Sequence, residues 1–357
     1  MESKSSQTVD MEPSRGTLPA PVAPTEASRT SDRALQWASR RARILAPLLT
    51  LVAMVVFFSI ASDRFLDVRN FQNILTQVAP VAVAATGITF VLLCAEIDLS
   101  IASVATFSGV LAAYFWVGNW LDLGNWGVLV GLLVGAGIGI INGYFVSRIG
   151  IPSFMMTLAM LTIAAGLAVY VTQGRPIFES PTLLRYLGGS GNRIIGIPVI
   201  AIVAVITLIL GEFILGYTKF GRYVFMTGGN REAAEMSGVN TRQVIMLCLM
   251  ISGITASIAG MLAVGRLSQA NPAAGGDLLI ATIAAVVLGG TSLFGGEGGI
   301  RNTVLGILIF GVLSNGLNLM PNISIYIKEA LQGIILVGAL LLNVLALRLE
   351  RVRSRAE

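Results

Sequence analysis

The side chains that usually carry acid–base or metal chemistry are scarce in this sequence. Its 357 residues include no histidine, which removes the commonest general base and the commonest metal ligand. Cys94 and Cys248 lie inside apolar runs and are typical of small buried hydrophobic residues, not of a disulfide or a metal site. The glycine-rich phosphate loop that ends in Gly-Lys-Ser or Gly-Lys-Thr does not occur. We therefore predict that the chain is not an enzyme, binds no metal or cofactor and does not hydrolyse ATP by itself.

A small set of polar residues is better placed to contact a passing solute than to catalyse a reaction. They lie where apolar segments begin, end or are interrupted: Asp98, Ser100, Asn271, Asp277 and Asn315. Hydroxylated solutes need hydrogen-bond donors and acceptors, but only a few, because tight binding would trap the cargo. The alternative is that Asp98 and Asp277 only cap helices, since an Asp directly before an apolar run is a normal N-cap. The sequence leaves both interpretations open.

A short polar helix is predicted in Gly228–Asn240, between two long apolar segments. Asn230 is a good N-cap, Glu232 places negative charge in the first turn, and Gly238 suits the left-handed residue that ends a helix. So short a helix is marginal alone and must pack on something. It is either a loop on its own bundle or a docking helix for a separate cytoplasmic subunit. The predicted docking residues are Gly221, Arg222, Gly228, Gly229, Asn230, Glu232, Ala233, Ala234, Ser237 and Gly238.

The composition predicts that these residues are held by an all-α membrane protein. The chain is 55% hydrophobic and 12% charged, whereas soluble domains carry roughly 25% charged residues. A bilayer-crossing helix needs about 20 apolar residues. Segments of this kind are 44–62, 71–94, 99–117, 126–148, 153–173, 194–216, 243–265, 278–292, 301–319 and 326–347.

The positions of Lys and Arg predict the direction of these ten spans. If the N-terminus is cytoplasmic, most of the Lys and Arg residues near the spans lie inside, as the positive-inside rule requires. Both termini and the segment 217–243 then face the cytoplasm. We expect a disordered tail at 1–32, a permease domain at 33–347 and a basic tail at 348–357. Membrane orientation also accounts for the net charge of +5 better than a nucleic-acid partner does.

Two halves of the chain carry similar sequence motifs, which the predicted topology places in opposite orientations across the membrane. Asp98–Ala105 resembles Asp277–Ala284, and the Asn-Gly pair at 142–143 recurs at 315–316. In the predicted topology the first motif starts from inside and the second from outside, which is the mark of an inverted repeat. The repeat units would be spans two to five and seven to ten, unless the similarity is a coincidence of apolar sequence.

The glycines of the fourth span recur every four residues and share one face of the helix. They are Gly131, Gly135, Gly139 and Gly143. Such a face lets another helix approach closely. We predict tight helix packing there and infer nothing from it about a substrate.

Several stretches closely resemble the sugar-type ABC importer permeases, the ribose/xylose/arabinose/galactoside permease family. They cover residues 44–347 in the family's order and include Gly87–Ser103, Asn142–Leu161, Gly221–Asn240, Ala284–Ile300 and Gly311–Leu319. The resemblance implies a type II importer fold and a bacterial inner-membrane location. It implies a second permease subunit as a homodimer partner, a periplasmic binding protein, and an ATPase that docks on residues 230–237. ATP and Mg would bind to that ATPase.

Two departures from the family pattern bear on the solute. Leu278–Ala281 stands where the family usually has acidic residues, and Glu96 stands where it usually has Gly. A monosaccharide importer is predicted, and a polyol, a signalling furanose, a nucleoside or an amino acid is the alternative. A secondary carrier would suit the inverted repeat, but such carriers usually keep several ionisable groups at membrane depth. A membrane enzyme would need a nucleophile–base pair that the sequence does not offer.

Overall fold

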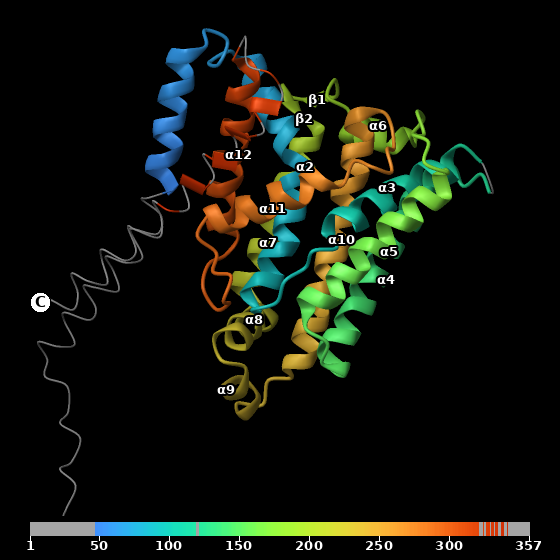
Figure 1. The fold of residues 1–357 in the computed structure, drawn as a ribbon, viewed down its shortest axis with the longest axis vertical. Helices are drawn as coiled ribbons and strands as arrows, with labels where there is room; N and C mark the ends of the chain where they lie inside the picture. The colour runs from blue at the N-terminus through green and yellow to red at the C-terminus, as the bar shows by residue number, and fades with distance from the viewer. Residues whose placement is uncertain are drawn as a thin grey trace, which may run out of the picture.

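Apolar helices make up most of the described structure. The computed structural model describes residues 47–118 and 121–320, and within 324–341 it describes 324, 326–328, 330–331, 333–334, 337–338 and 341. The helices, shown in Figure 1, are Pro47–Ala61, α2 (Val68–Leu93), α3 (Ile101–Trp116), η1 (Gly124–Trp126), α4 (Gly127–Tyr144), η2 (Phe145–Ile149), α5 (Ser153–Thr172), α6 (Thr182–Gly188), α7 (Val199–Tyr217), α8 (Lys219–Gly229), α9 (Arg231–Met236), α10 (Thr241–Leu267), α11 (Gly276–Leu288) and α12 (Ile300–Leu319).

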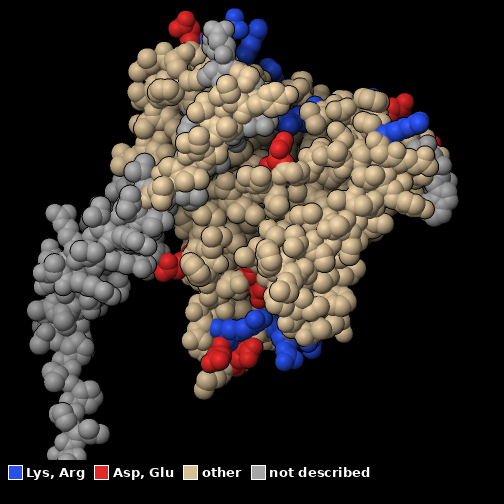
Figure 2. Space-filling model, viewed as in Figure 1, with Lys and Arg blue, Asp and Glu red and all other residues tan. Residues whose placement is uncertain are grey.

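Six of these helical segments are long and apolar enough to cross a membrane. They contain α2, α4 with η2, α5, α7, α10 and α12. Three shorter apolar helices, Pro47–Ala61, α3 and α11, coincide within a few residues with the predicted segments 44–62, 99–117 and 278–292. Figure 2 shows charged side chains near the two ends of the visible face and very few across its broad middle. The predicted all-α membrane class is confirmed at this level.

Some of the sequence predictions fall outside the described residues, and one boundary differs from the structure. The tails 1–32 and 348–357 lie outside, and so does most of the predicted tenth span, 326–347. The predicted sixth span begins too early, because β1 (Arg193–Ile194) and β2 (Ile197–Pro198) form an antiparallel hairpin there. Ile195 and Gly196 make its turn with left-handed backbone, and α7 begins only at Val199.

The helices α2 and α10 form the centre of the bundle. They pack against each other, α10 also packs on α3 and α4, and α2 also packs on α11 and α12. Most of the residues in α2 and α10 are buried, whereas α4, α5 and α7 turn large apolar side chains outward. Outward apolar faces at the periphery are what a lipid environment requires.

The helix contacts keep the same pattern when two sets of helices are exchanged. The pair α3 and α4 has its counterpart in α11 and α12, and the packing of α10 on α3 and α4 has its counterpart in the packing of α2 on α11 and α12. Exchanging α2, α3 and α4 with α10, α11 and α12 therefore leaves these contacts in place.

The glycine face of α4 packs as the sequence predicted. Gly131 lies against α3, and Gly135, Gly139 and Gly143 lie against α10. A Cβ at Gly139 would be 2.5 Å from the carbonyl oxygen of Leu249 and 2.8 Å from the Cα of Met250. Gly137, on the opposite side of the same helix, has nothing within 4 Å of the Cβ position.

Gly139→Ala is expected to destabilise the protein by about 1–3 kcal/mol, because the added methyl group must push two helix backbones apart. Gly137→Ala is the matched control, and it should hold or raise stability because Ala favours the helix over Gly. Thermal unfolding of the detergent-purified chain measures both. Equal midpoints for the two variants would contradict close packing at Gly139.

Candidate functional site

The polar segment predicted between apolar spans forms two short helices at one end of the bundle. The Thr218 hydroxyl accepts a hydrogen bond from the Gly221 amide at 3.1 Å and caps α8. The Asn230 side chain accepts one from the Ala233 amide at 3.0 Å and caps α9. Gly238 is left-handed and ends the turn. The predicted capping residues Asn230 and Gly238 are confirmed, and Figure 1 shows α9 projecting from the lower end of the bundle.

One side of α9 is held by the bundle and the rest is exposed. Ala234 is only 2% exposed and belongs to a buried cluster with Val239 and Val244. Met236 is 90% exposed. We call the exposed residues Glu232, Ala233, Glu235 and Met236 the α9 tip. Figure 2 shows acidic and basic side chains together at this end of the visible face.

The predicted docking residues therefore fall into two groups, those buried by the chain itself and those exposed on its surface. Gly221 and Ala234 are buried by the chain itself, and Gly228 is half-buried. At Gly221 an added Cβ would collide with the carbonyl oxygens of Leu215 and Ile214, so no side chain fits there. The exposed members are Arg222, Gly229, Asn230, Glu232, Ala233, Ser237 and Gly238. Buried members position the helix, and exposed members are available to a partner.

The start of α9 is anchored where glycine backbones meet the end of α2. A Cβ at Gly228 would lie 1.7 Å from the carbonyl oxygen of Leu93, and the Gly296 amide donates a hydrogen bond to that same oxygen at 3.0 Å. Gly295 and Gly296 are left-handed residues of the loop 289–299 between α11 and α12. We call Gly228, Gly229, Gly295 and Gly296 the glycine junction.

Asp98 and Ser100 lie in a buried hydrogen-bond network in the segment 94–100, which we call the α2–α3 break. The amide and hydroxyl of Ser100 donate to Asp98 Oδ1 at 2.9 and 2.6 Å. The Ser252 hydroxyl of α10 donates to Asp98 Oδ2 at 2.6 Å, and Asn142 Nδ2 of α4 donates to Ser100 Oγ at 3.1 Å. Asp98 is 3% exposed. Burial raises its pKa, and the hydrogen bonds from Ser100 and Ser252 act in the opposite direction.

Neither Asp98 nor Asp277 occupies the N-cap position of its helix. Ser100 is the N-cap residue of α3 and Gly275 that of α11. Asp98 nevertheless accepts a hydrogen bond from the Ser100 amide at the start of α3, and it also accepts one from Ser252 of α10, a contact that no local pattern reveals. Asp277 is an exposed residue in the first turn of α11.

Asp98→Ala is expected to destabilise the protein by about 2 kcal/mol, because the Ser100 and Ser252 hydroxyls lose their buried acceptor. Asp98→Asn keeps one carbonyl oxygen, and a serine oxygen can accept from its amide, so we expect a loss below about 1 kcal/mol. Thermal unfolding and solute uptake are measured together. A folded Asp98→Asn variant without uptake would show that the carboxylate charge itself is needed.

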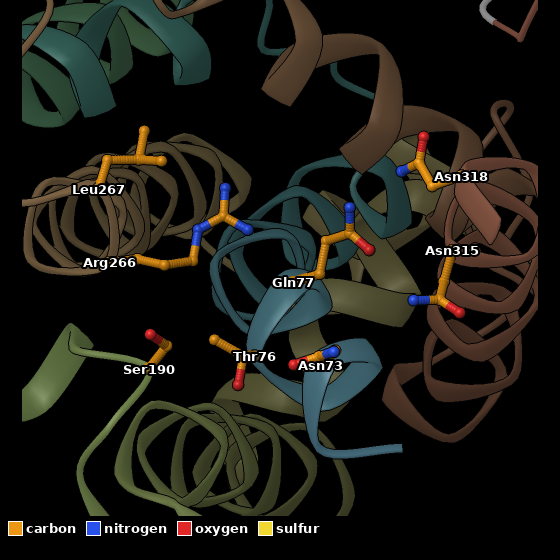
Figure 3. Close-up of a pocket in the computed structure, with 8 residues that line it drawn as sticks. All are labelled: Asn73, Thr76, Gln77, Ser190, Arg266, Leu267, Asn315 and Asn318. Atoms are coloured by element: carbon orange, nitrogen blue, oxygen red, sulfur yellow. The ribbon is translucent and has the colours of Figure 1, made fainter. Parts of the chain in front are cut away.

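A polar cavity of ≈ 380 Å³ lies at the other end of α10 from α9. Its lining residues, drawn in Figure 3, are Asn73, Thr76, Gln77, Ser190, Arg266, Leu267, Asn315 and Asn318. They come from α2, from the segment after α6, and from the ends of α10 and α12. Figure 3 shows the Arg266 guanidinium and the Gln77 amide extending toward the middle of the site, with Asn315 and Asn318 across from them.

Two buried polar atoms of this cavity have no hydrogen-bond partner among the described residues. They are Nε of Arg266 and Oδ1 of Asn315. One is a donor and the other an acceptor, and both belong to residues that line the cavity.

Among the predicted pathway residues, Asn315 lines this cavity and the others lie elsewhere. Asp98 and Ser100 belong to the buried network, Asn271 accepts a hydrogen bond from the Ala273 amide at 3.0 Å in its own turn, and Asp277 is exposed. Sequence reasoning missed Asn73, Thr76 and Gln77, although polar residues three and four apart within an apolar segment mark one helix face. It also missed Arg266, which it used only to orient the spans.

Membrane-length helices, a polar cavity at one end and an exposed polar helix at the other define a multi-pass membrane transport protein. The chain belongs to a family of transport permeases, because its residues 70–340 match the family described as "Branched-chain amino acid transport system / permease component". The permease class that the sequence motifs predicted is thereby confirmed.

Similar proteins cover most of the chain. The chain is 35% identical over 300 residues to the ribose import permease protein of Escherichia coli K12, covering 83% of this chain and 92% of that one. Identity to the D-allose transport system permease protein of the same organism is 30%, with 82% and 88% covered. Identity to the L-arabinose ABC transporter permease protein of Azospirillum brasilense is 30%, with 97% and 98% covered.

Proposed function

We propose that this chain is the membrane-spanning permease subunit of an ABC importer that carries a monosaccharide. The observation that carries the proposal is its similarity, over most of its length, to permeases whose names specify ribose, allose and arabinose. A separate ATPase binds ATP and Mg and drives transport, a periplasmic binding protein delivers the sugar, and a second copy of the chain completes the pathway. The assembly lies in a bacterial inner membrane.

The cavity supports a hydroxylated solute. Its lining offers amide, hydroxyl and guanidinium groups that donate or accept hydrogen bonds, and the described lining residues include no carboxylate. The family description names branched-chain amino acids. The ammonium group of an amino acid would call for an acidic acceptor, and no acidic residue is among the described lining residues. A sugar is therefore the better fit. Asn315 is the predicted pathway residue that we place in contact with it.

The α9 tip is the contact surface for the ATPase, with the α9 end of the bundle and both chain termini in the cytoplasm. Its support is the combination of a helix anchored by Ala234 and an exposed Met236. Asp98, Ser100, Asn271 and Asp277, the other proposed pathway residues, do not line the cavity in the state described.

The complete fold has ten spans and an inverted repeat of spans two to five and seven to ten. The exchange of α2, α3 and α4 with α10, α11 and α12 supports this arrangement, because it preserves the contacts between helices. It is the contact pattern that a pseudo-two-fold axis in the membrane plane produces.

The test is uptake by proteoliposomes that contain the permease, the ATPase encoded beside it and the binding protein. Uptake of radiolabelled ribose, allose or arabinose is expected to require ATP and all three components. Uptake driven by an imposed proton or sodium gradient in the absence of ATP would contradict the importer and support a secondary carrier. Transport of leucine in preference to every sugar would contradict the proposed solute class.

A further inference from the structure

We propose that the ion pair between Glu96 and Arg231 links α9 to the α2–α3 break and passes the movement of α9 into the bundle. This inference rests on the proposed function, because it assumes that a partner ATPase moves α9. Glu96 is then a positioning residue, which acts on transport through Arg231 and the break and not by touching the solute.

The ion pair joins an exposed helix to a nearly buried segment. Arg231 Nη1 lies 3.6 Å from Glu96 Oε1, and the side chains are 48% and 12% exposed, respectively. Arg231 is the first residue of α9, and Glu96 follows Ala95, whose left-handed φ of 61° turns the chain out of α2. A pair with one nearly buried partner is screened less by salt than a pair on the open surface.

Three successive residues of the break that contains Glu96 form hydrogen bonds with the neighbouring helices α5 and α10. The Ile97 amide donates to Ser153 Oγ at 3.0 Å and the Leu99 amide donates to Thr157 Oγ1 at 3.1 Å, both on α5. Asp98, between them, accepts from Ser252 of α10. A displacement of Glu96 is therefore carried to α5 and α10, because the segment has little freedom to move alone.

The glycine junction beside the ion pair brings backbones into contact without side chains between them. Gly228 meets the carbonyl oxygen of Leu93, and a Cβ at Gly296 would lie 2.9 Å from the Cα of Gly229. Without side chains between them, these backbone segments do not interlock, so the contact by itself resists relative sliding of the segments only weakly. An ion pair across the same boundary supplies a directional connection.

Loss of Arg231 is expected to be costly at Glu96, because a nearly buried charge is then left without its counter-ion. Burial raises the pKa of Glu96, and the hydrogen bond from Ser153 and the charge of Arg231 act to lower it. Arg231 thus helps to keep an ionised carboxylate in a place that by itself disfavours one.

The experiment measures sugar uptake and ATP hydrolysis in the same proteoliposomes, with permease, ATPase and binding protein present. Glu96→Gln and Arg231→Gln are each expected to lower the uptake per ATP hydrolysed by about fivefold or more. The amount of co-purified ATPase should stay at the wild-type level. Arg242→Gln, which removes another exposed cation at the same end, is the control and should leave uptake per ATP unchanged.

The double variant Glu96→Gln/Arg231→Gln separates the link from a general loss of structure. If the two residues act as a pair, the double variant is no worse than either single variant. The exchanged pair Glu96→Arg/Arg231→Glu should also recover part of the uptake per ATP if it folds. Full additivity of the two single effects, or wild-type uptake per ATP in both single variants, would overturn the inference. If wild type itself shows no ATP-dependent uptake, the proposed function fails instead.

Discussion

Met236→Glu is expected to abolish ATP-dependent uptake while leaving the permease folded. Met236 is 90% exposed at the end of α9, so a charge there costs the isolated chain little. In a complex the same side chain would be covered by the ATPase, where an unpaired buried charge costs about 3–5 kcal/mol. That penalty corresponds to a loss of affinity of roughly 10²-fold to several thousandfold. Co-purification of the ATPase with the tagged permease measures it directly.

Two further substitutions in α9 separate docking from folding. Met236→Leu keeps an apolar surface of similar size and should retain the ATPase. Ala234→Glu places the charge inside the chain's own buried cluster and should lower the thermal stability of the permease itself. Recovery of the ATPase at the wild-type level with Met236→Glu would move the docking surface away from the α9 tip. Failure of Met236→Leu alongside Met236→Glu would show that the loss comes from shape and not from charge.

The helices and the caps of α9 could be predicted because their causes are local. Apolar segments of membrane length form helices because a helix pairs its own backbone N–H and C=O groups by hydrogen bonds. The length of each segment is evident from the hydropathy of the sequence. Asn230 and Gly238 act on backbone groups within a few residues of themselves, so their roles follow from spacing alone. The close-packing face of α4 was predictable for the same reason, since a four-residue period fixes one helix face.

The cavity and the anchoring of Asp98 could not be predicted in this way, because they depend on contacts between distant segments. Thr76, Arg266 and Asn315 meet only after α2, α10 and α12 have packed. Asp98 bonds both to Ser100 beside it and to Ser252 on another helix, and only the local bond could be expected from its sequence neighbours. The direction of Ala234 likewise depends on what α9 packs against.

Arg266→Met is expected to lower sugar uptake by about 10- to 100-fold at equal ATPase recovery and equal thermal stability. Arg266 lines the cavity, and its Nε has no hydrogen-bond partner in the described part of the chain, so we expect its guanidinium to donate to the solute during transport. A hydrogen bond from a charged donor contributes about 1.5–3 kcal/mol, which sets the size of the effect. Methionine keeps most of the apolar stem and removes the guanidinium alone.

Arg266→Lys distinguishes the shape of the donor group from its charge. Lysine keeps a positive charge but loses the planar fork that can hold two neighbouring hydroxyl groups, so we expect uptake between that of wild type and Arg266→Met. Uptake at the wild-type level in Arg266→Lys would mean that charge alone is needed. Uptake at the wild-type level in a stable Arg266→Met variant would show that the cavity is not on the solute's path. The contact with sugar would then have to be sought at the α2–α3 break, where Asp98 and Ser100 are hydrogen-bonded to each other in the state described.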